Sequence, residues 1–189
     1  LFYIMNVYFF LPDLSAGGAE RVTITIARLL KKNGFDVGFI NLGLPIGEMY
    51  DWIVPEFKMV SLGCTRVLSA IPKLHSFMKQ HPEAKYFSSR EHVNVVGLLC
   101  AKVAKCNMIV RIPNMPKNDL VKGVAGMKAS IIKKINKRLL GNAKWIIAQN
   151  TEMRDQLLEY YGLPDRKVVA INNPIDIDYV RSSAEGSMN

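Results

Sequence analysis

The sequence has no long hydrophobic run. No stretch reaches the roughly 18 consecutive apolar residues that a membrane-spanning helix requires, so we expect no transmembrane segment. Residues 1–11 are largely apolar, but no basic region precedes them and no small-residue cleavage site follows them. They therefore predict a first buried strand and not a signal peptide.

Cysteine and histidine are scarce, with three residues of each. Neither set has the spacing of a metal site, and three is an odd number for disulfide pairing. We therefore expect no metal and no other cofactor, and reduced thiols in a cytoplasmic protein. The residues concerned are Cys64, Cys100, Cys106, His75, His81 and His92.

Two common phosphate-binding motifs are also missing. The turn after the first predicted strand lacks the third glycine of the dinucleotide-binding Gly-x-Gly-x-x-Gly motif, and the second strand ends at Asn41 and not at an acidic residue that would bind a ribose. No Gly-x-x-x-x-Gly-Lys-Ser/Thr sequence is present. These absences argue against a nicotinamide-dependent enzyme and against a P-loop NTPase.

The chain does contain a pair of glycines, Gly17 and Gly18, between an apolar strand and an amphipathic helix. Glycine leaves backbone N–H groups accessible, and the N-terminus of a helix attracts anions. We therefore predict a phosphate-binding turn. The alternative is that both glycines only let the helix pack close to a sheet. Glu20 is expected to cap this helix, whose inward stripe is predicted to be Ala19, Val22, Ile26, Leu29 and Leu30.

Strand and helix signals alternate along the chain, which predicts a doubly wound, mostly parallel α/β sheet of about seven strands. Asn150 or Thr151 is expected to begin the last helix and Gly162 to end it. The predicted strands are 7–11, 37–41, 58–62, 86–88, 108–112, 145–149 and 167–171. The predicted helices begin near residue 18 and span 69–80, 93–105, 120–140 and 151–161.

Ligands of such sheets bind beyond the carboxyl ends of the strands. His92 is the titratable candidate there, with helix capping or a surface position as the alternative. Arg111 suits a phosphate or carboxylate, with a salt bridge as the alternative. The candidate acceptor-binding residues are Ser89, Arg90, His92, Asn94, Arg111 and Asn114.

Net charge is +9, and it is concentrated in residues 117–144, which hold eight basic residues and one acidic residue. Apolar residues recur at helical spacing through this segment and include Ile135 and Leu139. One interpretation is a core-packed helix with a solvated basic face. The other is a surface that docks on anionic lipid head groups or an anionic acceptor, formed by Lys122, Lys128, Lys133, Lys134, Lys137 and Arg138.

The chain also contains Asp176-Ile177-Asp178, which matches an Asp-x-Asp metal-binding pattern. It follows the last predicted strand in an Asn-Pro-x-Asp context. We therefore interpret it as turn or hinge sequence and not as a metal site.

Several segments together resemble the N-terminal domain of the retaining, nucleotide-sugar-dependent glycosyltransferases of family 4, which have the GT-B fold. The match is carried by residues 11–22, 148–151, 157–162, 167–169 and 173–176. The resemblance implies two Rossmann-like domains that face a cleft, the first mainly binding the acceptor and the second mainly binding the donor. It also implies that Gly17 and Gly18 approach the donor diphosphate.

On this basis, residues 1–180 are expected to form the acceptor-side Rossmann-like domain and residues 181–189 a linker or tail. The donor-binding C-terminal domain, with the principal catalytic residues, is expected to be absent. His92 is the one catalytic candidate within the chain, because the family places a histidine or an acidic residue in this neighbourhood.

The expected activity is hexosyl transfer from a nucleotide-diphosphate sugar to a glycan or glycolipid hydroxyl, with retention, in polysaccharide or glycolipid synthesis. The expected partners are the donor, a glycan or lipid-linked acceptor, an anionic membrane surface at the inner face and the C-terminal domain, and the chain alone should be inactive. The alternatives are a non-catalytic anion-binding module and, ranked last, a nucleic-acid binder, since only Trp145 lies near the lysines. Sugar, nucleotide and acceptor identities are left open.

Overall fold

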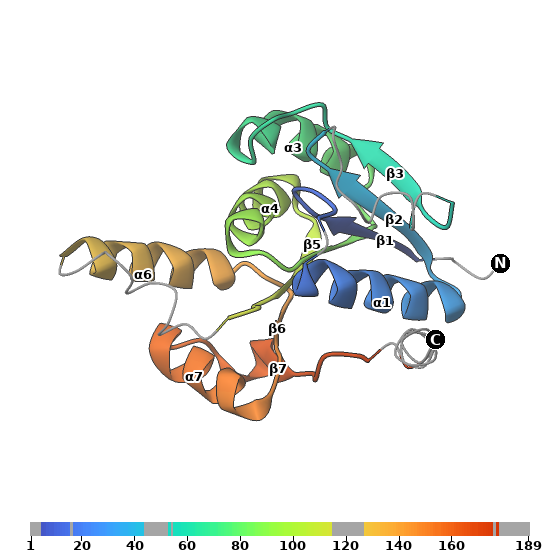
Figure 1. Ribbon diagram of the computed structural model, residues 1–189. Helices are drawn as coiled ribbons and strands as arrows, with labels where there is room; N and C mark the ends of the chain where they lie inside the picture. Colours follow the sequence, from blue (N-terminus) through green and yellow to red (C-terminus); the bar gives the residue numbers. More distant parts are fainter. Residues whose placement is uncertain are drawn as a thin grey trace.

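A computed structural model describes residues 5–15, 17–43, 53, 55–114, 127–175 and 177, and the backbone alone for 127–133. Its strands form one seven-stranded sheet in the order β3-β2-β1-β4-β5-β6-β7 (Figure 1). Every neighbouring pair is parallel. The strands are β1 (Asn6–Phe10), β2 (Asp36–Asn41), β3 (Lys58–Ser61), β4 (Lys85–Ser88), β5 (Asn107–Arg111), β6 (Trp145–Ala148) and β7 (Val168–Ala170).

The strands are apolar over most of their length because both faces of the sheet are covered. On one face, Phe9 packs against Phe39 and Phe87, with ring centroids 5.4 and 5.0 Å apart. On the other face, Tyr8 stacks on Tyr86 with centroids 6.0 Å apart. The central strand β1 therefore contributes aromatic side chains to both layers of the core.

The helices divide unequally between the two faces (Figure 1). Among the described helices, α1 (Gly18–Lys32) packs on the face of Phe9 through Ile24 and Ala27. The opposite face is covered by α3 (Ile71–Gln80), which follows a 3-10 turn at Leu68–Ala70, and by α4 (Glu91–Ala104), α6 (Met127–Leu140) and α7 (Thr151–Tyr161).

The predicted doubly wound parallel sheet of about seven strands is confirmed, with strand limits shifted by about one residue. Asn150 begins α7, since its side chain accepts a hydrogen bond of 2.7 Å from the Met153 N–H, and Gly162 ends the helix in the left-handed region. The basic helix is described from Met127 onward. Lys122 and the Asp176 and Asp178 side chains lie outside the described residues, as do the side chains of Lys128 and Lys133.

The predicted inward position of Leu29 was wrong, and the core-packed interpretation of the basic helix does not hold at Ile135. Leu29 is 49% exposed and Ile135 is 52% exposed. The buried side of α1 is formed by Glu20, Thr23, Ile24 and Ala27, so it is rotated relative to the predicted stripe, of which Ile26 and Leu30 are partly buried against the core. Hydrophobic periodicity missed this rotation because it assigns every carboxylate to solvent. Within the described chain, no helix combines the length and apolar character needed to span a bilayer.

Candidate functional site

The turn between β1 and α1 presents backbone N–H groups for which the described residues hold no backbone acceptor. Gly17 is the N-cap residue of α1, with no side-chain cap, and its own N–H donates to the Ser15 carbonyl at 2.8 Å. The first helical hydrogen bond runs from the Arg21 N–H to the Gly17 carbonyl at 3.1 Å. The N–H groups of Gly18, Ala19 and Glu20 precede this bond, and no backbone carbonyl of the described residues accepts from them. This arrangement can bind an anion.

The two glycines have different surroundings. A Cβ atom on Gly17 would overlap with the Oε2 atom of Glu20, whereas a Cβ atom on Gly18 would have no neighbour within 4 Å. Gly17 is thus required by the carboxylate of the chain's own Glu20. Gly18 is exposed and leaves the open approach to the free N–H groups.

Glu20 lies beneath the turn and does not cap the helix. Its side chain is 1% exposed, and Oε1 lies 2.6 Å from the Arg90 Nε atom in an ion pair. Arg90, which comes from the carboxyl end of β4, also donates from Nη2 to the Ser15 hydroxyl at 3.3 Å and places Nη1 3.6 Å from Asp13 Oδ2. Arg90 was predicted as an acceptor-binding residue, and the structure places it as the clamp of the turn.

Asp13 organises the beginning of the same turn. Its Oδ1 accepts from the N–H and the hydroxyl of Ser15, at 3.1 and 2.6 Å. Partial burial works to raise the pKa of Asp13, but the two hydrogen bonds from Ser15 and the positive charges of Arg90 and His92 outweigh it, so the pKa is lowered. His92 is exposed and lies near enough to the turn to act on Asp13 electrostatically.

A second set of polar side chains lies at the ends of β4 and β5. Arg111 is 3% exposed. Its Nη1 atom donates to the Ser89 hydroxyl at 2.9 Å, and its Nη2 atom donates to the Asn173 Oδ1 atom at 2.5 Å. Burial lowers the pKa of Arg111. The predicted residues Ser89 and Arg111 are therefore in direct contact.

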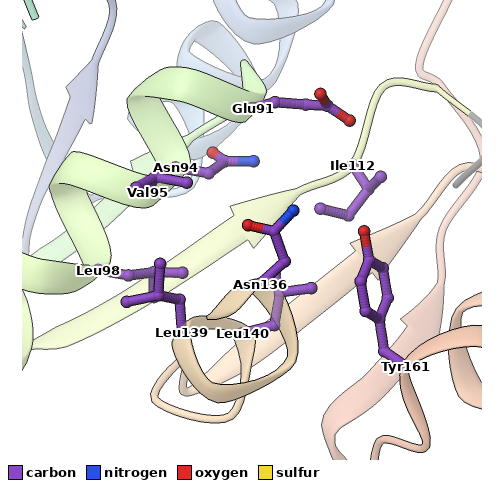
Figure 2. A pocket seen from close by; sticks show the side chains of 9 residues that line it. All are labelled: Glu91, Asn94, Val95, Leu98, Ile112, Asn136, Leu139, Leu140 and Tyr161. Carbon is purple, nitrogen blue, oxygen red and sulfur yellow. The ribbon is translucent and has the colours of Figure 1, made fainter. Parts of the chain in front are cut away.

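Asn94 ties the two strand ends together. Its Oδ1 atom accepts from the Ser88 hydroxyl at 2.5 Å, and its Nδ2 atom donates to the Arg111 carbonyl at 3.0 Å. Asn94 is 3% exposed. It also lines a small pocket between α4, α6 and α7, with a volume of about 40 Å³ (Figure 2), which is room for a few water molecules.

The pocket is lined by both polar and apolar side chains. Figure 2 shows the Glu91 carboxylate, the Asn136 amide and the Tyr161 hydroxyl among the side chains that line it. Sequence reasoning missed these three residues, because they come from three different helices and no local motif connects them. The rest of the lining is Asn94, Val95, Leu98, Ile112, Leu139 and Leu140.

The other predicted residues lie at the surface. His92 and Asn114 are exposed at the ends of β4 and β5, and Lys134, Lys137 and Arg138 are exposed on α6. Lys137 has a local neighbour, since its Nζ atom lies 2.9 Å from the position that a Cβ atom on Gly162 would take, at the end of α7. Positive charge is favourable at a helix C-terminus, so Lys137 also serves the contact between α6 and α7.

Comparison with known proteins shows a family and several solved structures to which this chain is similar. The sequence profile of Glycosyltransferase Family 4 matches residues 16–179. A protein of Haemophilus influenzae described as an uncharacterized glycosyltransferase is 50% identical over 42 residues, which are 22% of this chain and 10% of that protein.

Solved structures match over nearly the whole chain. Anabaena Alr3699/HepE in complex with UDP and glucose is 14% identical with a TM-score of 0.69, over 98% of this chain and 50% of that chain. UDP-GlcNAc 2-epimerase from Neisseria meningitidis, bound to UDP-GlcNAc, is 15% identical with a TM-score of 0.65, over 97% and 50% of the two chains. The chain thus spans about half the length of these proteins, and at such identity the likeness shows the fold alone.

Proposed function

Because this chain belongs to glycosyltransferase family 4, we propose that it forms the acceptor-side half of a hexosyltransferase. The enzyme would move a sugar from a nucleotide-diphosphate donor to a hydroxyl of a glycan or glycolipid, with retention of anomeric configuration. The observation that carries the proposal is the set of N–H groups at Gly18, Ala19 and Glu20, for which the described residues hold no backbone acceptor. HepE, which shares the fold, binds UDP and glucose in its solved structure.

The turn fits the charge that develops in sugar transfer. As the bond to the sugar breaks, negative charge grows on the diphosphate leaving group. Fixed N–H dipoles directed at that charge stabilise the transition state more than the ground state. The Glu20–Arg90 ion pair beneath the turn holds these dipoles in place before the donor arrives.

The acceptor would bind along the neighbouring strand ends. His92 and Asn114 are exposed there, and Ser89 and Arg111 lie just below the surface. His92 is the candidate for direct contact with the reacting hydroxyl, and the principal catalytic groups would come from a donor-binding domain. No step in this scheme requires a metal held by the described residues.

A substitution at Gly18 tests the role of the turn. Gly18→Val places a branched side chain where, apart from the adjoining backbone, no described atom lies within 4 Å, so we expect the fold to persist and kcat to fall about 10²- to 10³-fold. Transfer from nucleotide-sugar donors is measured in an enzyme that contains this chain and its donor-binding domain. Lys32→Ala, at the other end of α1, is the matched control.

The chain alone should neither turn over nor bind nucleotide tightly. Turnover by residues 1–189 alone would contradict the assignment of the catalytic groups to another domain. Tight binding of a nucleoside diphosphate without turnover, measured by isothermal titration, would favour the anion-binding module instead.

The exposed face of α6 is the candidate membrane surface. Lys134 and Arg138 are exposed beside Ile135, which is 52% exposed. The neighbouring helix α4 exposes Val103 at 69%. Cationic and apolar side chains together suit an anionic bilayer surface, so we propose peripheral binding at the inner face of the membrane.

Liposome co-sedimentation at low salt tests this surface. Binding should require anionic lipid and should weaken in Lys134→Glu/Arg138→Glu, but not in Lys79→Glu, which changes an exposed lysine on α3. Equal binding to neutral and anionic vesicles would contradict the proposal.

A further inference from the structure

Arg111 is a buried cation without an anionic partner in the described structure. Its side chain is 3% exposed, and its two nitrogens donate to a hydroxyl and an amide oxygen, both neutral. No ion pair joins it to any carboxylate among the described residues. Burying a charge without an opposite charge costs free energy. An anionic ligand bound beside Arg111 would supply the opposite charge.

The other well-placed arginines show that the chain supplies carboxylates where it uses arginine structurally. Arg28 pairs with Glu56 at 2.5 Å, Arg90 pairs with Glu20, and Arg154 pairs with Asp155 and Asp165. All three are more exposed than Arg111. Among these four arginines, the most deeply buried guanidinium is thus the one for which the described residues hold no carboxylate partner.

A neutral and replaceable group occupies the outer side of Arg111. Asn173 is exposed and follows β7, and its Oδ1 atom accepts from Arg111 Nη2 at 2.5 Å. Its Nδ2 atom donates to Gln149 Oε1 at 3.1 Å. The amide oxygen of Asn173 takes the position of one oxygen of a carboxylate or phosphate, while Ser89 is buried on the inner side.

We propose that Arg111 binds a carboxylate or phosphate group carried by the acceptor, and that this group displaces the Asn173 amide. The planar guanidinium matches both anions in a forked geometry. The site adjoins the donor turn, because Ser89 directly precedes Arg90, the clamp of that turn. The acceptor class is therefore an acidic glycan or a phosphate-bearing glycolipid. That the bound anion belongs to the acceptor rests on the proposed function, whereas anion binding at Arg111 does not.

Two substitutions with opposite effects test the site. Arg111→Gln removes the cation and should weaken anion binding about 10- to 100-fold, the range for hydrogen bonds to charged groups. Asn173→Ala removes the competing oxygen and should strengthen binding. A merely structural arginine would not produce an increase in Asn173→Ala. Lys144→Gln removes an exposed positive charge at the opposite end of β6 and controls for net charge.

Inorganic phosphate and glucuronate are the probes, each against sodium chloride of equal ionic strength. Binding to the 189-residue chain is followed by calorimetry and by the shift in Tm, and the stronger probe separates phosphate-bearing from carboxylate-bearing acceptors. Wild type should gain Tm with a probe, and Arg111→Gln should not. If Arg111→Gln fails to fold, Asn173→Ala still tests the proposal, because stronger anion binding in this variant supports it and unchanged or weaker binding contradicts it.

Absence of specific binding in both wild type and Asn173→Ala would overturn the inference, as would equal binding in Arg111→Gln. Sugar transfer to an acidic acceptor that is unaffected by Arg111→Gln would also overturn it and would leave the proposed function intact. Loss of transfer in Gly18→Val is independent of the anion site, so the two proposals fail separately.

Discussion

At the scale of single residues, the βα turn is stabilised by a carboxylate that solvent does not reach. Glu20 is 1% exposed and depends on Arg90 for its counter charge. Gly17 is a glycine because the Glu20 carboxylate fills the space of its side chain, and Gly18 is a glycine with open space above it. The two adjacent positions thus favour glycine for different physical reasons.

Removing Arg90 should cost more stability than removing both members of the pair. Arg90→Gln leaves the buried Glu20 carboxylate without a partner, and we expect a loss of about 3 kcal/mol in the free energy of unfolding. Glu20→Gln/Arg90→Gln should recover part of this loss because no uncompensated charge remains. Urea denaturation of the two single variants and the double variant forms the cycle. Additive effects would show that the ion pair is not the source of the loss.

The two glycines should respond oppositely to alanine. Gly17→Ala displaces the Glu20 carboxylate, which is buried and paired with Arg90, and overpacking of this kind costs about 1–3 kcal/mol. Gly18→Ala adds a methyl group in free space at the first turn of α1 and should be neutral or stabilising by up to about 1 kcal/mol. Thermal unfolding measures both, each variant serving as the control of the other. Equal destabilisation would mean that Glu20 can move without cost.

At the scale of elements, α7 shows how one helix is defined at both ends by local chemistry. Asn150 caps its first turn, and Gly162 ends it with φ +57°, a conformation that favours glycine. Its buried residues Met153 and Leu157 pack on the sheet. The Lys137 ammonium group beside Gly162 joins this helix end to α6.

Asn150→Ala should destabilise the protein by about 1 kcal/mol, since the Met153 N–H loses its acceptor. Asn150→Asp retains an acceptor and should remain within a few tenths of a kcal/mol of wild type. Chemical denaturation of both variants measures the free energy of unfolding. An equal loss in the two would show that the capping hydrogen bond is not the source of the destabilisation.

At the scale of the whole molecule, the core is two aromatic and aliphatic layers divided by one parallel sheet. Because β1 is central, it contributes to both layers, through Phe9 on the α1 side and Tyr8 and Phe10 on the other. The polar turns lie at the carboxyl edge of this sheet, where loops from separate elements meet. The rigidity of the edge therefore derives from the central strands.

Shortening a buried aromatic side chain within the sheet should strongly reduce the free energy of unfolding. Phe9 is fully buried between Phe39 and Phe87, and Phe9→Ala should cost about 3–5 kcal/mol. Leu29→Ala, at an apolar position of α1 that is 49% exposed, should cost much less. Urea denaturation compares the two, and a similar cost would mean that Leu29 is packed more tightly than its exposure indicates.

Local sequence was sufficient to predict the elements and their order. Buried strands need continuous apolar residues, and helix ends need residues such as Asn150 and Gly162, so both leave signals within a few positions of each other. The same reasoning selected Gly17, Gly18, Ser89 and Arg111 as strand-end candidates, because polar residues that follow buried strands lie at the ligand-binding edge. It also selected Asn94 as a possible contact.

Contacts between those candidates were decided by the tertiary structure. Arg90 reaches the first turn because β4 lies next to β1, although Arg90 and Ser15 are 75 positions apart in the chain. Asn173 reaches Arg111 across 62 positions for the same kind of reason. By itself, the sequence determined the family, the doubly wound sheet and the glycine turn. Only the fold decided which arginine is neutralised and which is buried without a counter charge, since strand order sets the partners of a side chain.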